Sequence, residues 1–145
     1  MKWLLLGIAG LVALIATMTL IGSFLPRSHT ASRTLRLRRS PPEVWPVVTQ
    51  MASGSSVEVD VVESSPPHRL VTRVKPTERH FGGTWTIAIA SVADGSTLTI
   101  TEDGWVANPI FRFISRLVIG HHATMDRLLK RVATALNEMP TLSGE

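Results

Sequence analysis

The stretch of sequence that decides the fold is TITEDGWVANPIFRFISRLV, residues 99–118. Its first residues alternate apolar and polar side chains, which is typical of a half-buried β-strand. Asn108 and Pro109 then give a helix start signal, because an asparagine side chain accepts hydrogen bonds from free amides and proline has a helical φ. The stretch therefore predicts a strand that runs through a glycine turn into an amphipathic helix.

The helix that starts at Asn108 is expected to continue almost to the C-terminus. At about 100° per residue, its apolar side chains form one stripe and its basic side chains gather on the opposite side. We interpret these as a core face and a solvated face; alternatively, the basic side lies along anionic headgroups, at about 1 kcal/mol per basic residue. The stripe comprises Ile110, Ile114, Leu117, Val118, His121, Met125, Leu128, Val132 and Leu136, and the basic side Arg112, Arg116, Arg127, Lys130 and Arg131.

The residues before this stretch predict one more helix and several strands. Ser40 and Glu43 have the spacing of a capping box, so a helix is expected to begin at Ser40 and to end near residues 51–54. Asp94-Gly95 predicts a tight hairpin. The alternating patterns predict strands at 33–39, 57–61, 69–75, 84–90 and 97–101.

Two further segments, ESSPPHRLVTRV at 63–74 and GGTWTIAI at 82–89, complete a resemblance. Together with residues 99–118, the chain resembles the START-like superfamily known as SRPBCC, which includes polyketide cyclases, Bet v 1 relatives and lipid-transfer domains. The resemblance covers residues 32–138. It implies an α+β helix-grip fold, an antiparallel sheet wrapped on a long C-terminal helix. This fold hosts binders and enzymes alike, so it does not by itself assign a function.

The N-terminal segment is a candidate membrane helix. Residues 3–25 contain no charged side chain and are long enough to cross a bilayer. A secretory signal would have a shorter apolar centre and a small-x-small cleavage site. We therefore expect a retained anchor, with a cleaved signal and a buried core helix as the alternatives. The expected organisation is an anchor at 1–25, a linker at 26–31, the domain at 32–138 and a flexible tail at 139–145.

Charge gives an expected topology and an expected partner. Five arginines lie between residues 27 and 39, against one lysine before the apolar segment, so the positive-inside rule predicts a single-pass protein with a cytoplasmic domain. The net charge of +4 is mild and fits an acidic membrane surface better than a nucleic acid. Membrane lipids are therefore the expected partner, and no nucleic acid is expected. The chain has no cysteine, so disulfides do not indicate a compartment.

The domain is shorter than the family pattern implies. Members have a second short helix and two more strands between the first helix and the strand equivalent to 57–61. At ordinary element lengths, about 30 residues are missing here. Three explanations stand at this point: a shallow open groove, a free sheet edge that pairs with another molecule, or a truncated gene.

Two titratable residues are weak candidates for catalysis. His121 lies in the apolar stripe and is expected to point toward the sheet, where a structural role is the simpler interpretation. Glu102 faces inward with Leu98 and Ile100 if the strand stays regular, and burial would then raise its pKa; the simpler interpretation is a solvated turn at 102–104. His121 and His122 diverge by about 100° on a helix, so no metal site and no cofactor are expected.

The expected function is non-catalytic binding of a hydrophobic small molecule or lipid between sheet and helix. One alternative is a cavity-less interaction protein, which an exposed sheet edge and a filled centre would favour. The other is an enzyme of the cyclase or dehydratase kind, which requires His121 and Glu102 to converge on one pocket. The expected cavity residues are Trp85, Ile87, Ile89, Leu98, Ile100, Trp105, Ile114, Leu117, His121 and Met125.

Overall fold

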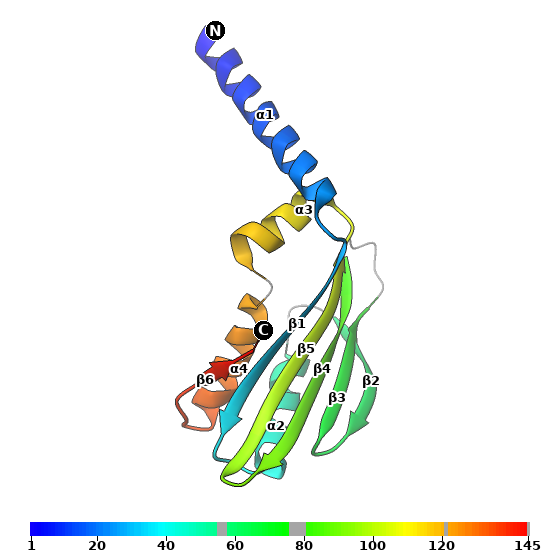
Figure 1. Ribbon diagram of the computed structural model, residues 1–145, viewed down its shortest axis with the longest axis vertical. Coiled ribbons are helices and arrows are strands. Elements are labelled where there is room, and N and C mark those ends of the chain that lie inside the picture. Colours follow the sequence, from blue (N-terminus) through cyan, green and yellow to red (C-terminus); the bar gives the residue numbers. More distant parts are fainter. Residues whose placement is uncertain (55–57, 76–80, 121, 145) are drawn as a thin grey trace.

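A computed structural model describes residues 1–54, 58–75, 81–120 and 122–144 of the chain. Figure 1 shows a sheet with helices against one face and a long N-terminal helix that projects from one end. The elements are, in order, α1 (Lys2–Phe24), β1 (Ser28–Leu37), α2 (Pro41–Ser53), β2 (Val59–Ser65), β3 (Arg69–Val74), β4 (Phe81–Val92), β5 (Gly95–Val106), α3 (Pro109–Phe113), the π-helix η1 (Ile114–Ile119), α4 (Ala123–Ala135) and β6 (Thr141–Ser143).

The strands form one antiparallel sheet in the order β2-β3-β4-β5-β1-β6. Helix α2 contacts β4, helix α4 contacts β1, and the two helices contact each other, so both lie on the same face, which we call the inner face. The opposite face is called the outer face. This arrangement confirms the predicted α+β helix-grip fold.

The core lies between the inner face and helices α2 and α4. Alternate residues of β5 are buried, including Leu98 and Ile100, as the sequence pattern predicted. Residues that are fully buried from four other elements pack against them: Leu35, Val44, Val48, Ile87, Met125, Leu129 and Val132. Each large apolar side chain buried in this way contributes about 1.5–3 kcal/mol to folding.

Helix α2 begins as its capping box predicted. The backbone amide and hydroxyl of Ser40 both donate to Glu43 Oε2, at 2.9 and 2.6 Å. The helix ends at Ser53, with Gly54 as the C-cap residue, in agreement with the expected end near residues 51–54.

Three strand boundaries differ from the expected ones. Strand β1 begins at Ser28, inside the expected linker, because it pairs with β5 from Ser28 opposite Trp105 to Leu37 opposite Ser96. Strand β5 continues to Val106, so the solvated turn expected at 102–104 is wrong. Strand β6 forms inside the expected flexible tail and pairs with β1. In each case the added residues become strand because they pair with a neighbouring strand, and most of them are polar or small.

The C-terminal helical region is divided, where one continuous helix was expected. Gly120 has a φ of 79° and separates the π-helical turn η1 from α4. The break resets the helical phase, so the apolar stripe does not continue across it. Met125 and Val132 are buried as expected, but Leu117 and Val118 are 58% and 69% exposed.

Candidate functional site

The inner face of the sheet has two halves of different character. Directly opposite residues on antiparallel strands share a face, so the strand register assigns each row. In the lower half, Ile87 lies opposite Ile100 and Ile89 opposite Leu98. In the upper half, nearer to α1, Trp85 lies opposite Glu102 and Gly83 opposite Gly104. The lower half is therefore apolar, whereas the upper half combines a tryptophan, two glycines and ionisable groups.

His29 and Glu102 meet in the upper half. Strand β1 places His29 opposite Gly104, and its Nε2 lies 3.5 Å from Glu102 Oε1. A Cβ atom on Gly104 would lie 2.6 Å from the His29 ring, so the absence of a side chain there makes room for the imidazole. Burial, together with the positive charge of Arg116, lowers the pKa of His29, and Asp103 offsets part of this effect. The imidazole is therefore neutral at neutral pH.

An ion pair joins the sheet to the C-terminal helix. Arg33 lies on the inner face of β1, and its Nε is 3.1 Å from Asp126 Oδ1 on α4. Both side chains are about one quarter exposed, at 24% and 26%. This ion pair lies at the boundary between the two halves, because Arg33 is opposite Ile100.

The junction between α1 and the domain is tightly built. Asn108 caps α3 as predicted, since its Oδ1 accepts from the amides of Ile110 and Phe111 at 2.9 and 3.3 Å. Arg112, expected on a solvated side, is instead 6% exposed. Its guanidinium donates to the carbonyl oxygens of Leu25 and Ala107, at 2.8 and 3.2 Å, and so ties α3 to the end of α1.

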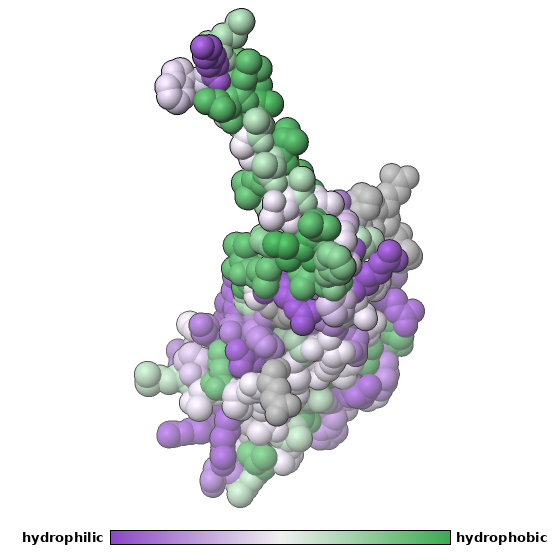
Figure 2. All heavy atoms as spheres, turned by 45° about the horizontal axis from the view of Figure 1, so that its top comes forward, coloured by the Kyte–Doolittle hydropathy of each residue, from purple (hydrophilic) through white to green (hydrophobic). Residues whose placement is uncertain are grey.

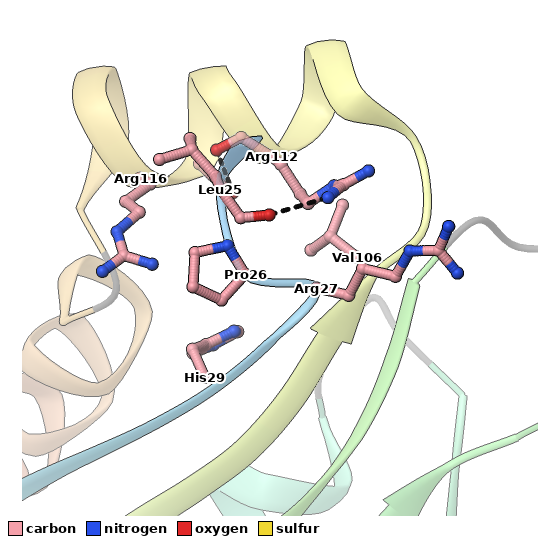
Figure 3. Close-up of a pocket in the computed structure, with 8 residues that line it drawn as sticks. Leu25, Pro26, Arg27, His29, Val106, Arg112 and Arg116 are labelled. Atoms are coloured by element: carbon pink, nitrogen blue, oxygen red, sulfur yellow. Dashed lines mark hydrogen bonds between the residues drawn. The ribbon is translucent and has the colours of Figure 1, made fainter. Parts of the chain in front are cut away.

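A small cavity lies beside this junction. Its volume of about 10 Å³ is enough for roughly one water molecule. Figure 3 shows His29, Pro26 and Arg116 around it, whereas the Arg27 guanidinium points away. Its lining consists of Leu25, Pro26, Arg27, His29, Val106, Arg112, Ser115 and Arg116.

A larger hollow, of about 450 Å³, lies between α2 and α4 and is open to solvent. Three cations and no acidic residue line it, so it is a cationic surface groove outside the core. Its lining consists of Met51, Arg127, Lys130, Arg131, Thr134 and Ala135.

The expected cavity residues do not surround one hollow in the described part of the chain. Ile87, Ile89, Leu98, Ile100 and Met125 pack together in the core, and Trp85 packs against them. None of them lines either of the two hollows described above. Their role in binding a ligand stays a prediction.

The other expected cavity residues lie elsewhere. Trp105 is 45% exposed. It lies on the outer face, because neighbouring residues of a strand point to opposite faces and Gly104 lies on the inner one. Ile114 is partly exposed in η1, and Leu117 is exposed. His121 lies outside the described residues, so its convergence with Glu102 stays a prediction.

Sequence reasoning missed His29 and the Arg33–Asp126 pair. The signal for His29 was the alternation of β1, which continues backward from Leu35 through Arg33 and Ala31 to His29. Small polar neighbours hid that alternation. Among the described residues, no three His, Cys, Asp or Glu side chains are grouped so as to hold a metal ion.

Comparisons with known proteins bear on the fold. No family model matches the chain. No curated protein matches it either. Among solved structures, protein MLL2253 from Mesorhizobium loti aligns with a TM-score of 0.60 and 11% identity, over 75% of this chain and 97% of that one.

Two further solved structures also align with most of the chain. A conserved protein from Geobacillus kaustophilus has a TM-score of 0.57 and 14% identity, over 79% of this chain and 99% of that one. A protein from Rhodobacter sphaeroides has a TM-score of 0.52 and 15% identity, over 74% and 88%. Among the described residues, α2 is followed directly by β2, with no second helix and no further strand between Ser53 and Val59, as expected from the sequence. The chain therefore shares the overall fold of these structures, and its architecture is the helix-grip fold that the resemblance implied.

Proposed function

We propose that this protein is a single-pass, membrane-anchored helix-grip module that binds an apolar small molecule or lipid on its inner face without catalysing a reaction. The observation that carries the proposal is the position of the upper half of the inner face. This half lies at the end of the sheet from which α1 projects (Figure 1), so a molecule that leaves the bilayer reaches it first. The domain is cytoplasmic by the positive-inside rule.

The anchor is supported by the length and surroundings of α1. It has 23 residues, and its most apolar window has a mean hydropathy of 2.5 and contains no buried residue. A helix of this kind exposes a continuous apolar surface that water does not favour and that matches the hydrocarbon thickness of a bilayer.

The upper half offers the mixture of groups that ligand sites use, an apolar floor with a few polar groups. Trp85 supplies the apolar surface, and the neutral imidazole of His29 and the carboxyl group of Glu102 supply the polar groups. Because the adjoining cavity is only about 10 Å³, a ligand enters when η1 and α4 move apart. Gly120 lies between them, and its φ of 79° departs from the helical path, so the chain can hinge at this residue.

Tryptophan fluorescence of the full chain in detergent tests the proposal. With Trp3, Trp45 and Trp105 replaced by phenylalanine, Trp85 reports on the upper half alone. A dibrominated fatty acid is expected to quench it saturably, because bromine must approach the indole closely. The matched control keeps Trp45 of α2 instead, which packs against the lower half and is expected to resist quenching. Equal, unsaturable quenching of both would contradict binding on the upper half.

A second candidate function is a protein-interaction module without a ligand. It is favoured by the filled core and by β2, which is an edge strand whose Val61 and Val62 are 63% and 50% exposed. Exposed edge strands pair readily with other chains. If the protein is an interaction module, replacing Val61 and Val62 with lysine abolishes its association with a partner protein, and the domain takes up no apolar probe.

A further inference from the structure

We infer that α3 and η1 lie in the headgroup–acyl boundary of the bilayer, beside the end of α1, as an apolar surface that holds the domain against the membrane. This inference rests on the proposed membrane crossing by α1. We call the surface the apolar seat. It is formed by Phe111, Leu117, Val118 and Ile119, which are 52%, 58%, 69% and 60% exposed.

The apolar seat is continuous with α1. Figure 2 shows hydrophobic side chains at the base of α1 that spread over the adjoining end of the domain, with hydrophilic side chains directly below them. Phe24, in the last turn of α1, adds an 83% exposed aromatic ring at this level. Contiguous exposed apolar surface of this kind marks an interaction site, and here it adjoins the segment that already needs a bilayer.

The depth of the seat relative to α1 is fixed by packing. Gly22 of α1 is buried against α3, and a Cβ atom there would overlap the backbone of Pro109. The guanidinium of Arg112 ties α3 to the carbonyl oxygen of Leu25. Because α3 cannot swing away without loss of these contacts, a bilayer that contains α1 meets the seat at the level where α1 leaves the hydrocarbon.

The residues around the seat match the chemistry of a membrane surface. Trp105 and Phe81 are 45% and 42% exposed at the same end of the sheet, and such rings concentrate at the level of lipid headgroups. Exposed Arg27 and Arg116 lie beside the seat and suit lipid phosphates. A helix with apolar residues on one side and arginines next to them is typical of segments that lie in the membrane plane.

The absence of cysteine from the chain permits a direct test with single-cysteine variants carrying an environment-sensitive fluorophore. The full chain is placed in vesicles of phosphatidylcholine and phosphatidylglycerol. Labels go at Val118 in the seat, at Leu11 in α1 and at exposed Ala135 in α4. We expect the Val118 and Leu11 labels to be quenched by spin-labelled lipid and shielded from iodide, and the Ala135 label to show the reverse.

Each other result overturns the inference in a recognisable way. If the Leu11 label is quenched by lipid but the Val118 label is quenched by iodide, α1 crosses the bilayer and the apolar seat does not contact it. If the Leu11 label is quenched by iodide, both the membrane crossing by α1 and the membrane contact of the apolar seat are contradicted. If the Val118 label is shielded from iodide yet escapes the lipid quencher, a protein, such as a second copy of the chain, covers this surface instead.

A matched pair of substitutions tests whether the apolar side chains themselves hold the seat. With the label at Ile119→Cys, the double change Leu117→Asp and Val118→Asp is expected to abolish quenching by lipid, whereas Thr124→Asp, at an exposed position of α4, leaves it unchanged. Retained quenching in the double variant would show that the seat is not held by these residues.

Discussion

The two halves of the inner face belong to the same strands but have different roles. In the lower half, Ile100 and Ile87 are completely buried under α2 and α4. In the upper half, Glu102, two residues beyond Ile100 on β5, and His29 on β1 retain 23% and 14% side-chain exposure. The strand alternation continues through both halves, but α2 and α4 cover the apolar side chains of the lower half, whereas the ionisable side chains of the upper half stay partly exposed. We infer that the lower half of the inner face provides most of the stability of the domain and that the upper half binds the ligand.

The largest predicted difference between the halves lies along β5. Ile100→Ala removes a fully buried side chain and is expected to lower the free energy of unfolding by about 2–5 kcal/mol. Glu102→Gln, two residues along on the same face, is expected to cost under about 1 kcal/mol, because its pair with His29 is partly exposed. Urea unfolding of the full chain in detergent measures both. Similar losses from the two changes would remove the distinction between the halves.

The upper half nevertheless has one strict structural requirement. A Cβ atom on Gly83 would lie 2.7 Å from the carbonyl oxygen of Asp103 on the neighbouring strand. Gly83→Ala is therefore expected to destabilise the protein by about 1–3 kcal/mol, since the strand backbones must separate. Gly54→Ala is the control, because its Cβ would meet only ordinary contacts from 3.5 Å. Thermal unfolding compares them; a harmless Gly83→Ala would contradict this close approach.

The ion pair at the boundary is expected to have a smaller effect. A double-mutant cycle with Arg33→Met and Asp126→Asn isolates its coupling energy. Because both side chains are about one quarter exposed, solvent screens the pair, and we expect about 0.5–1 kcal/mol. Strictly additive losses would show that Arg33 and Asp126 do not join sheet and helix in solution.

The smallest predicted effect is a dependence of stability on pH in the upper half. The pKa of His29 is lowered from its ordinary value of 6.5, so the unfolded chain binds this proton more readily than the folded one. The contribution of the neutral His29 imidazole to the free energy of unfolding is complete above pH 6.5. It is lost as the pH falls from there through the pKa of His29 in the folded state. His29→Asn is expected to flatten this part of the stability profile; an unchanged profile would exclude His29 as its source.

Local signals in the sequence predicted local structure well. The capping box at Ser40 and the Asn108 cap both form the expected hydrogen bonds, because each depends only on residues within three positions. The alternation of β5 likewise predicted that Leu98 and Ile100 are buried, although Trp105 was wrongly assigned to the interior, and the resemblance predicted the fold class.

Features that depend on one backbone angle or on distant packing were missed. The positive φ of Gly120 resets the helix phase, so a stripe drawn through it assigned Leu117 to the interior. His29 lies among small polar residues, where alternation has no hydrophobic contrast and only pairing with β5 defines the strand. The buried position of Arg112 depends on the carbonyl oxygen of Leu25, which is 87 residues away in the chain.

The most direct test of the account is native mass spectrometry of the full chain, released from membranes in detergent. We expect the wild type to carry a co-purifying apolar molecule. Glu102→Trp fills the upper half of the inner face and is expected to lose it. Asp103→Trp, the next residue on the same strand and on the outer face, is expected to retain it. An empty wild-type protein, or a ligand that both variants retain, would contradict binding on the inner face.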